Sequence, residues 1–105
     1  MMYLKIHDGK GGKVVAVCDR ELIGKVLEEG DVFIDLDKYR GFYIGDISDD
    51  GAVREALKSF DSANLVGERA VNVALHMNLA EKGDIMYINT TPYIQLYRIE
   101  GGEGV

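Results

Sequence analysis

Residues 2–18 read MYLKIHDGKGGKVVAVC and predict a β-hairpin at the start of the chain. Strand-like patterns over residues 2–7 and 13–18 flank a glycine-rich turn at residues 9–12. A turn of this length places Ile6 opposite Val15 and Leu4 opposite Val17. This face of the hairpin is wholly apolar, so it is expected to lie in the core.

The other face of the hairpin has mixed polarity. Its members are Tyr3, Lys5, His7, Val14, Ala16 and Cys18. An antiparallel sheet commonly buries one face and leaves the other in contact with water. The mixed face is therefore expected to be the wetter side of a sheet.

A helix is expected after the hairpin. Asp19 is a typical N-cap residue, and Gly30 is a typical C-terminal stop. The apolar residues between them fall on one helical face: Leu22, Ile23, Val26 and Leu27. Residues 31–36 alternate as in a strand, residues 37–41 form a polar turn, and residues 42–47 form a second strand.

The remaining chain predicts two helices and a final hairpin. Asp49 or Asp50 caps a short helix whose apolar positions follow the i, i+3, i+4, i+7 pattern, namely Val53, Ala56, Leu57 and Phe60. Residues 61–64 break it, and a longer helix covers residues 65–79, with an inner stripe of Val66, Ala70, Val73, Ala74 and Met77. Strands over residues 84–89 and 93–99 flank a turn at residues 90–92.

The predicted order is therefore β-β-α-β-β-α-α-β-β. Hairpins at both ends favour an α+β fold with a mixed, largely antiparallel sheet and helices packed on one face. We expect residues 1–100 to form a single domain and residues 101–105 a flexible C-terminal tail.

Composition excludes several classes of protein. The 105 residues are 47 % hydrophobic, which disfavours global disorder, and the net charge is −6. Acidic residues concentrate in residues 26–61, so non-specific nucleic-acid binding is disfavoured. The single cysteine and the lack of an apolar leader or a bilayer-length apolar run favour a cytoplasmic protein without a membrane partner.

Two short segments resemble each other: residues 21–24 read ELIG and residues 64–67 read NLVG. Each places a glycine early in a predicted helix, where glycine costs about 1 kcal/mol relative to alanine. Close backbone packing or a bound anion at the helix starts would explain that choice. The candidate residues for such an anion site are Asp19, Arg20, Gly24, Asn64, Gly67 and Arg69.

The last predicted strand carries a second candidate binding surface. Tyr93, Gln95 and Tyr97 share one face, and Ile94 and Leu96 on the other face are the expected core side. Tyrosine is enriched in recognition surfaces because it combines a large apolar area with a polar hydroxyl. A recognition strip and a face covered by another element both remain open.

Other motifs fail on spacing or context. Residues 9–13 lack the full phosphate-loop pattern, and residues 46–51 lack calcium-loop spacing. Cys18 at a helix start would be reactive only with a base and an orienting group nearby, and the sequence places neither beside it. We therefore expect no catalytic residue, no metal site and no cofactor.

Five segments resemble a known family. They are residues 3–7 (YLKIH), 14–19 (VVAVCD), 21–25 (ELIGK), the pattern Phe42-Tyr43-x-Gly45, and residues 64–71 (NLVGERAV). Together these segments resemble the archaeal domain-of-unknown-function 424 family over nearly the whole chain. The resemblance implies an archaeal, cytosolic, single-domain α+β protein with no established reaction, found in translation-related gene neighbourhoods. Family members often have Pro-His before the last strand, where this chain has Pro92-Tyr93.

Three functions follow as hypotheses. The first is a non-enzymatic binding or adaptor module with a protein or ribonucleoprotein partner, linked to translation. The second is a small-molecule or anion-binding protein with a site at the paired helix starts. One version of this hypothesis makes the protein an enzyme that acts through Cys18 or Arg69. The third is an RNA-contacting protein that uses Lys5, Lys10 and Lys13 beside Tyr3. The oligomeric state stays open.

Overall fold

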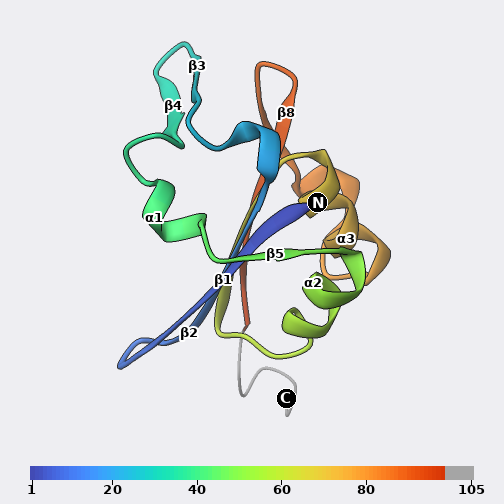
Figure 1. Ribbon diagram of the computed structural model, residues 1–105. Helices are drawn as coiled ribbons and strands as arrows, with labels where there is room; N and C mark the ends of the chain where they lie inside the picture. Colours follow the sequence, from blue (N-terminus) through green and yellow to red (C-terminus); the bar gives the residue numbers. More distant parts are fainter. Residues whose placement is uncertain (99–105) are drawn as a thin grey trace.

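The computed structural model describes residues 1–98 and contains one large sheet (Figure 1). Its six strands lie in the order β5-β1-β2-β6-β8-β7, and β3 and β4 form a separate two-stranded sheet. The bounds are β1 Met2–Gly9, β2 Gly12–Asp19, β3 Val26–Glu29, β4 Val32–Asp35, α1 Arg40–Tyr43, β5 Asp46–Ser48, α2 Asp50–Ala56, β6 Ser62–Val66, α3 Glu68–His76, β7 Met86–Ile88 and β8 Thr91–Tyr97, with short 3-10 turns η1 Arg20–Leu22 and η2 Lys82–Asp84.

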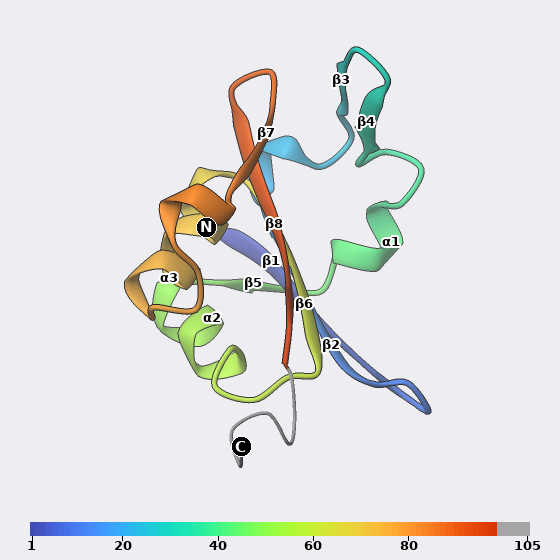
Figure 2. The same cartoon turned by 180° about the vertical axis from the view of Figure 1, so that it is seen from behind.

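The predicted fold class is confirmed. All neighbouring strands of the large sheet pair antiparallel except β2 and β6, which run parallel. Helices α2 and α3 lie together against one face of the sheet, as Figures 1 and 2 show from opposite sides. The tail expected at residues 101–105 lies outside the described residues. None of the helices within residues 1–98 is long and apolar enough to cross a membrane.

The register of the first hairpin is confirmed. Ile6 pairs with Val15 and Leu4 pairs with Val17, although the strands extend further toward the turn than predicted. Val15 and Val17 are fully buried against α2 and α3, whereas Ile6 remains 43 % exposed. The tip of this hairpin projects beyond the layer of helices (Figure 1), which leaves Ile6 partly uncovered although its partner Val15 is buried.

The second face of the hairpin is not the wetter side, contrary to expectation. Ala16 and Cys18 on β2 are fully buried in a second apolar cluster with Leu36, Tyr43 and Val66. We call residues 26–43, which form β3, β4 and α1, the arm. The arm folds back over this face of the sheet, on the side opposite α2 and α3 (Figure 2). Both faces of β2 are therefore core.

The prediction of a helix between Asp19 and Gly30 is wrong. The chain makes one 3-10 turn, η1, and then the β3–β4 hairpin, with Gly30 at φ +61° in its two-residue turn. The spacing of the apolar residues in this segment fits the period of a helix as well as that of a strand. Leu27 and Ile34 lie directly opposite each other and pack on the second cluster, so burial against the sheet selects the strand.

Two further boundaries differ from the prediction. Residues 62–64, within the segment expected to break a helix, belong to β6, and α3 begins only at Glu68. Since β6 lies between β2 and β8 and buries Ala63, Leu65 and Val66, its short apolar run resembles the start of the following helix. Residues 42–47, expected as a strand, contain the end of α1 and the start of the short β5.

The N-terminus of α3 is capped by a residue from another strand. Asp19 at the end of β2 accepts hydrogen bonds from the backbone N–H groups of Arg69 (3.0 Å) and Ala70 (2.9 Å). Cys18 lies beside Val66 in the parallel β2–β6 pair, so the next residues, Asp19 and Gly67, meet at one edge of the sheet. Gly67 has φ +108°, and a methyl group there would overlap the Asp19 carboxylate.

We predict that Gly67→Ala lowers the free energy of unfolding by about 2–4 kcal/mol, because it adds backbone strain and displaces the cap. Gly24→Ala is the matched control. It has φ +94°, but the nearest neighbouring atom, Arg40 Nη2, lies 3.7 Å from the added carbon. The control should lose only about 1 kcal/mol in urea unfolding followed by circular dichroism. Equal losses for the two variants would show that the contact with Asp19 has no special role.

Candidate functional site

An open groove of about 740 Å³ separates the arm from the outer face of β6 and β8. Its walls are mainly aromatic and aliphatic. The lining residues are Phe33, Ile34, Asp35, Leu36, Tyr39, Phe42, Tyr43, Asn64, Leu65, Val66, Met86, Tyr93, Ile94 and Gln95. This volume lies within the range of ordinary ligand pockets, and the composition resembles the centre of a protein interface.

The floor of the groove contains a polar group of side chains. Asn64 on β6 lies opposite Gln95 on β8, and the Gln95 amide donates to Asn64 Oδ1 at 2.9 Å. The Tyr97 hydroxyl donates to Gln95 Oε1 at 3.5 Å. Tyr93, two positions away on the same face, is half-buried beside the second apolar cluster. Amide groups in an apolar groove supply orientation, because they add donors and acceptors at fixed positions.

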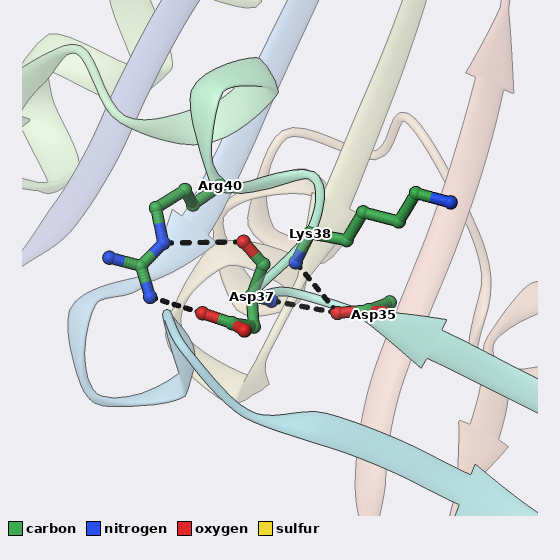
Figure 3. A network of polar contacts seen from close by, with 4 residues as sticks. All are labelled: Asp35, Asp37, Lys38 and Arg40. Carbon is green, nitrogen blue, oxygen red and sulfur yellow. Dashed lines mark hydrogen bonds and ion pairs between the residues drawn. The ribbon is translucent and has the colours of Figure 1, made fainter.

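Polar contacts fix the wall of the groove at the end of β4 (Figure 3). Asp35 Oδ1 accepts from the backbone N–H groups of Asp37 (3.1 Å) and Lys38 (2.7 Å). Arg40 pairs with the Asp37 carboxylate and also donates to its carbonyl. The side chain of Asp35 thus forms an Asx-turn, in which a carboxylate oxygen takes the place of a backbone carbonyl. This turn positions Tyr39 and α1 relative to β4.

The two ends of the arm are held to the large sheet. At its hairpin tip, Asn89 in the β7–β8 turn donates to the Glu28 carbonyl at 3.1 Å and to the Glu29 carboxylate. At α1, the ring of His7 stacks on Phe42 at 4.6 Å, and His7 Nε2 donates to the Phe42 carbonyl at 2.9 Å. These two sets of contacts hold the arm in place over the sheet, so the groove between them has a fixed shape.

The predicted anion site is not assembled. Gly24 follows a 3-10 turn, so one of the two expected helix starts does not exist. At the other, Asp19 already occupies the N–H groups of α3. Burial raises the pKa of Asp19, and the backbone N–H groups of Arg69 and Ala70 oppose that shift.

The two arginines of that candidate site line different depressions. Arg20 is exposed, with its guanidinium 6.0 Å from the centre of the Tyr3 ring. Arg69 lines a depression of about 340 Å³ beside α3, together with Asp19. Four carboxylates share this depression with it: Asp19, Glu21, Asp50 and Glu68. The acidic surroundings disfavour an anion there.

The lysines considered for RNA contact are partly engaged by the chain itself. Lys5 Nζ donates to the Gly41 carbonyl at 2.8 Å, which ties β1 to the arm. The backbone N–H of Lys13 donates to the Asp61 carboxylate at 2.6 Å, so an acidic group lies beside this lysine. Lys10, the third lysine considered, is exposed in the turn of the hairpin.

Cys18 has a structural environment. The thiol is fully buried, and burial raises its pKa to about 12. Burial likewise raises the pKa of Tyr43, in the same cluster, to about 12. Within residues 1–98, no group of three or more His, Cys, Asp or Glu side chains is arranged to hold a metal ion.

Sequence reasoning found part of the groove and missed the rest. Tyr93 and Gln95 were candidates for a recognition strip and lie in its floor, with Tyr97 next to them. Asn64 also lies in the floor, although it was a candidate for the anion site. Phe33, Tyr39, Phe42, Tyr43 and Met86 were not candidates, although four aromatic residues within residues 33–43 are a visible local enrichment. Their role depends on the arm folding back, which residues 26–43 alone do not determine.

The molecule is thus an α+β protein with an aromatic groove on the side of its sheet opposite the main helices. A family model described as "Protein of unknown function (DUF424)" matches residues 6–99, so the chain belongs to that family. No curated protein matches the sequence.

A solved structure supports the fold. The chain is similar to an uncharacterized conserved protein from the archaeon Methanopyrus kandleri, with 25 % identity and a TM-score of 0.74. The similarity covers 93 % of this chain and 94 % of the other. These comparisons establish family and fold, and neither description names an activity.

We predict that the Cys18 thiol does not react with a disulfide reagent in the folded protein. With a pKa near 12, the thiolate fraction at neutral pH is on the order of a thousandfold below that of a free thiol. Adding Ala52→Cys, at an exposed position on α2, provides the internal control. One thiol should titrate at once and the second only in denaturant; rapid titration of both would show that Cys18 is accessible.

Proposed function

We propose that this protein is a non-enzymatic binding module that docks a segment of a partner protein in the groove between the arm and the sheet. The observation that carries the proposal is the aromatic lining of the groove around the Asn64–Gln95 pair. Aromatic side chains supply most of the energy at docking surfaces, while polar groups at fixed positions supply orientation.

The exposed rim favours a macromolecule over a small ligand. Phe33 and Tyr39 at the groove remain 61 % and 57 % exposed, and Tyr97 beyond its floor is 70 % exposed. A small molecule within the groove would leave Tyr97 uncovered. A chain segment that continues across the outer face would cover both regions, as expected for a contiguous apolar patch.

The chemistry of the lining supports binding rather than bond-making. The groove is lined by aromatic rings, aliphatic chains, amides and one carboxylate, Asp35, which caps a turn. Cys18, the nucleophile that the sequence offered, is buried beneath the arm with a raised pKa. The translation machinery as the setting of the partner is proposed on the family resemblance alone.

We predict that Phe33→Ser/Tyr39→Ser abolishes recovery of a partner from an archaeal lysate. Loss of two exposed aromatic contacts should reduce the recovered partner at least tenfold, since about 1.4 kcal/mol corresponds to a factor of ten. Ile6→Ser/Ile47→Ser is the matched control, because it removes two exposed apolar side chains on β1 and β5, away from the groove.

The comparison uses quantitative mass spectrometry of affinity-purified wild type and both variants. Thermal unfolding of each variant checks that the fold is retained. The same proteins recovered in equal amounts by wild type and the Phe33/Tyr39 variant would exclude the groove as the docking site. A loss confined to the Ile6/Ile47 variant would move the docking site to the β1–β5 edge.

A further inference from the structure

The arm that walls the groove is strongly acidic. Its strands and turns, residues 26–37, contain five carboxylates and no lysine or arginine: Glu28, Glu29, Asp31, Asp35 and Asp37. Lys38 and Arg40 follow, and Arg40 is paired with Asp37. Within residues 1–98, neither Glu28 nor Asp31 forms an ion pair. Their charges are therefore available to a partner.

The strand register places negative charge beside the exposed ring of Phe33. Glu28 on β3 lies directly opposite Phe33 on β4, so their side chains share one face of the hairpin. Asp35 is two residues further along β4 and lies on the same face, at the groove. An apolar side chain that contacts Phe33 would thus have carboxylates as its neighbours.

An aromatic ring in the groove already accepts a cation from the chain itself. Lys38 Nζ lies 5.5 Å from the centre of the Tyr39 ring, within the range of a cation–π contact. Tyr39 is 57 % exposed, so its ring has free area for a second cation or for a basic side chain that replaces Lys38.

From these three observations we infer that the occupant of the groove is a basic protein segment: lysine or arginine residues on both sides of an aromatic or large aliphatic anchor. The anchor enters the groove between Phe33 and the Asn64–Gln95 pair. The flanking cations face Glu28, Asp31 and the Tyr39 ring. A phosphate backbone would meet the same carboxylates with repulsion, which disfavours RNA at this surface.

This inference rests on the proposed function, and synthetic peptides separate the two. The probes are Ac-Lys-Lys-Trp-Lys-Lys-NH2, its Ac-Glu-Glu-Trp-Glu-Glu-NH2 counterpart, and Ac-Lys-Lys-Ala-Lys-Lys-NH2. The protein contains no tryptophan, so the fluorescence of the two tryptophan peptides reports binding without background. Amide NMR spectra of the isotope-labelled full chain locate the binding site for all three.

The basic tryptophan peptide is expected to shift the resonances of Phe33, Tyr39 and Gln95. It should bind at least tenfold more tightly than either of the other peptides and at least threefold more weakly at 300 mM than at 50 mM salt, because screening weakens the flanking ion pairs (roughly an 8 Å Debye length at 0.15 M). Glu28→Gln/Asp31→Asn should weaken binding at least threefold. Asp8→Asn/Asp46→Asn, which removes two charges on β1 and β5, should not.

Each contrary result has a distinct meaning. Equal binding of the acidic and basic tryptophan peptides at the groove would overturn the charge preference and leave the docking site standing. Equal binding of the tryptophan and alanine peptides would overturn the anchor. If no peptide shifts groove resonances, the inference fails, and the lysate comparison then decides whether the proposed function fails with it.

Discussion

The fold depends on one carboxylate that joins two distant parts of the chain. Asp19 ends β2, and its two oxygens accept hydrogen bonds from the N–H groups of Arg69 and Ala70 in the first turn of α3, about fifty residues away. Parallel strands end at the same edge of a sheet, so the β2–β6 pair delivers Asp19 and Gly67 to one point. Position 67 has a φ of +108°, and glycine is the residue that adopts this conformation readily and leaves room for the Asp19 carboxylate. The cap thereby fixes the register of β2 on β6 and the start of α3 together.

The position of α3 determines which side chains of β2 face the arm on the other side of the sheet. Helices α2 and α3 cover the side of Val15 and Val17, so the small side chains of Ala16 and Cys18 face the arm. The arm seals them with Leu36 and Tyr43 and is anchored at its hairpin tip and at α1. It extends over β2 but does not fill the space above β6 and β8. The groove exists because the covering layer is narrower than the sheet beneath it.

Local patterns predicted the elements whose partners are close in sequence. The β1–β2 register and the burial of Ile94 on β8 follow from alternation within or between adjacent strands. The segment after Asp19 was different, because Leu22, Ile23 and Leu27 fit a helix as well as a strand. What decides between them is contact with a sheet face built from residues outside the segment, which no local period encodes. Alternation along β8 identified Tyr93 and Gln95, whereas Asn64 was named for a helix start and lies instead on β6. Phe33 and Tyr39 were missed because their place depends on how the arm folds over the sheet.

The repeated glycines show how one pattern arises from two causes. Gly24 and Gly67 share a positive φ, yet only Gly67 is crowded, and the anion beside it is the chain's own Asp19. The helix start that would suit a phosphate is therefore occupied, and acidic side chains surround the depression next to it. The groove has the same sign of charge along its wall. The groove and this depression therefore both display carboxylates, which selects against anionic ligands at these two surfaces and restricts the partners there by charge as well as by shape.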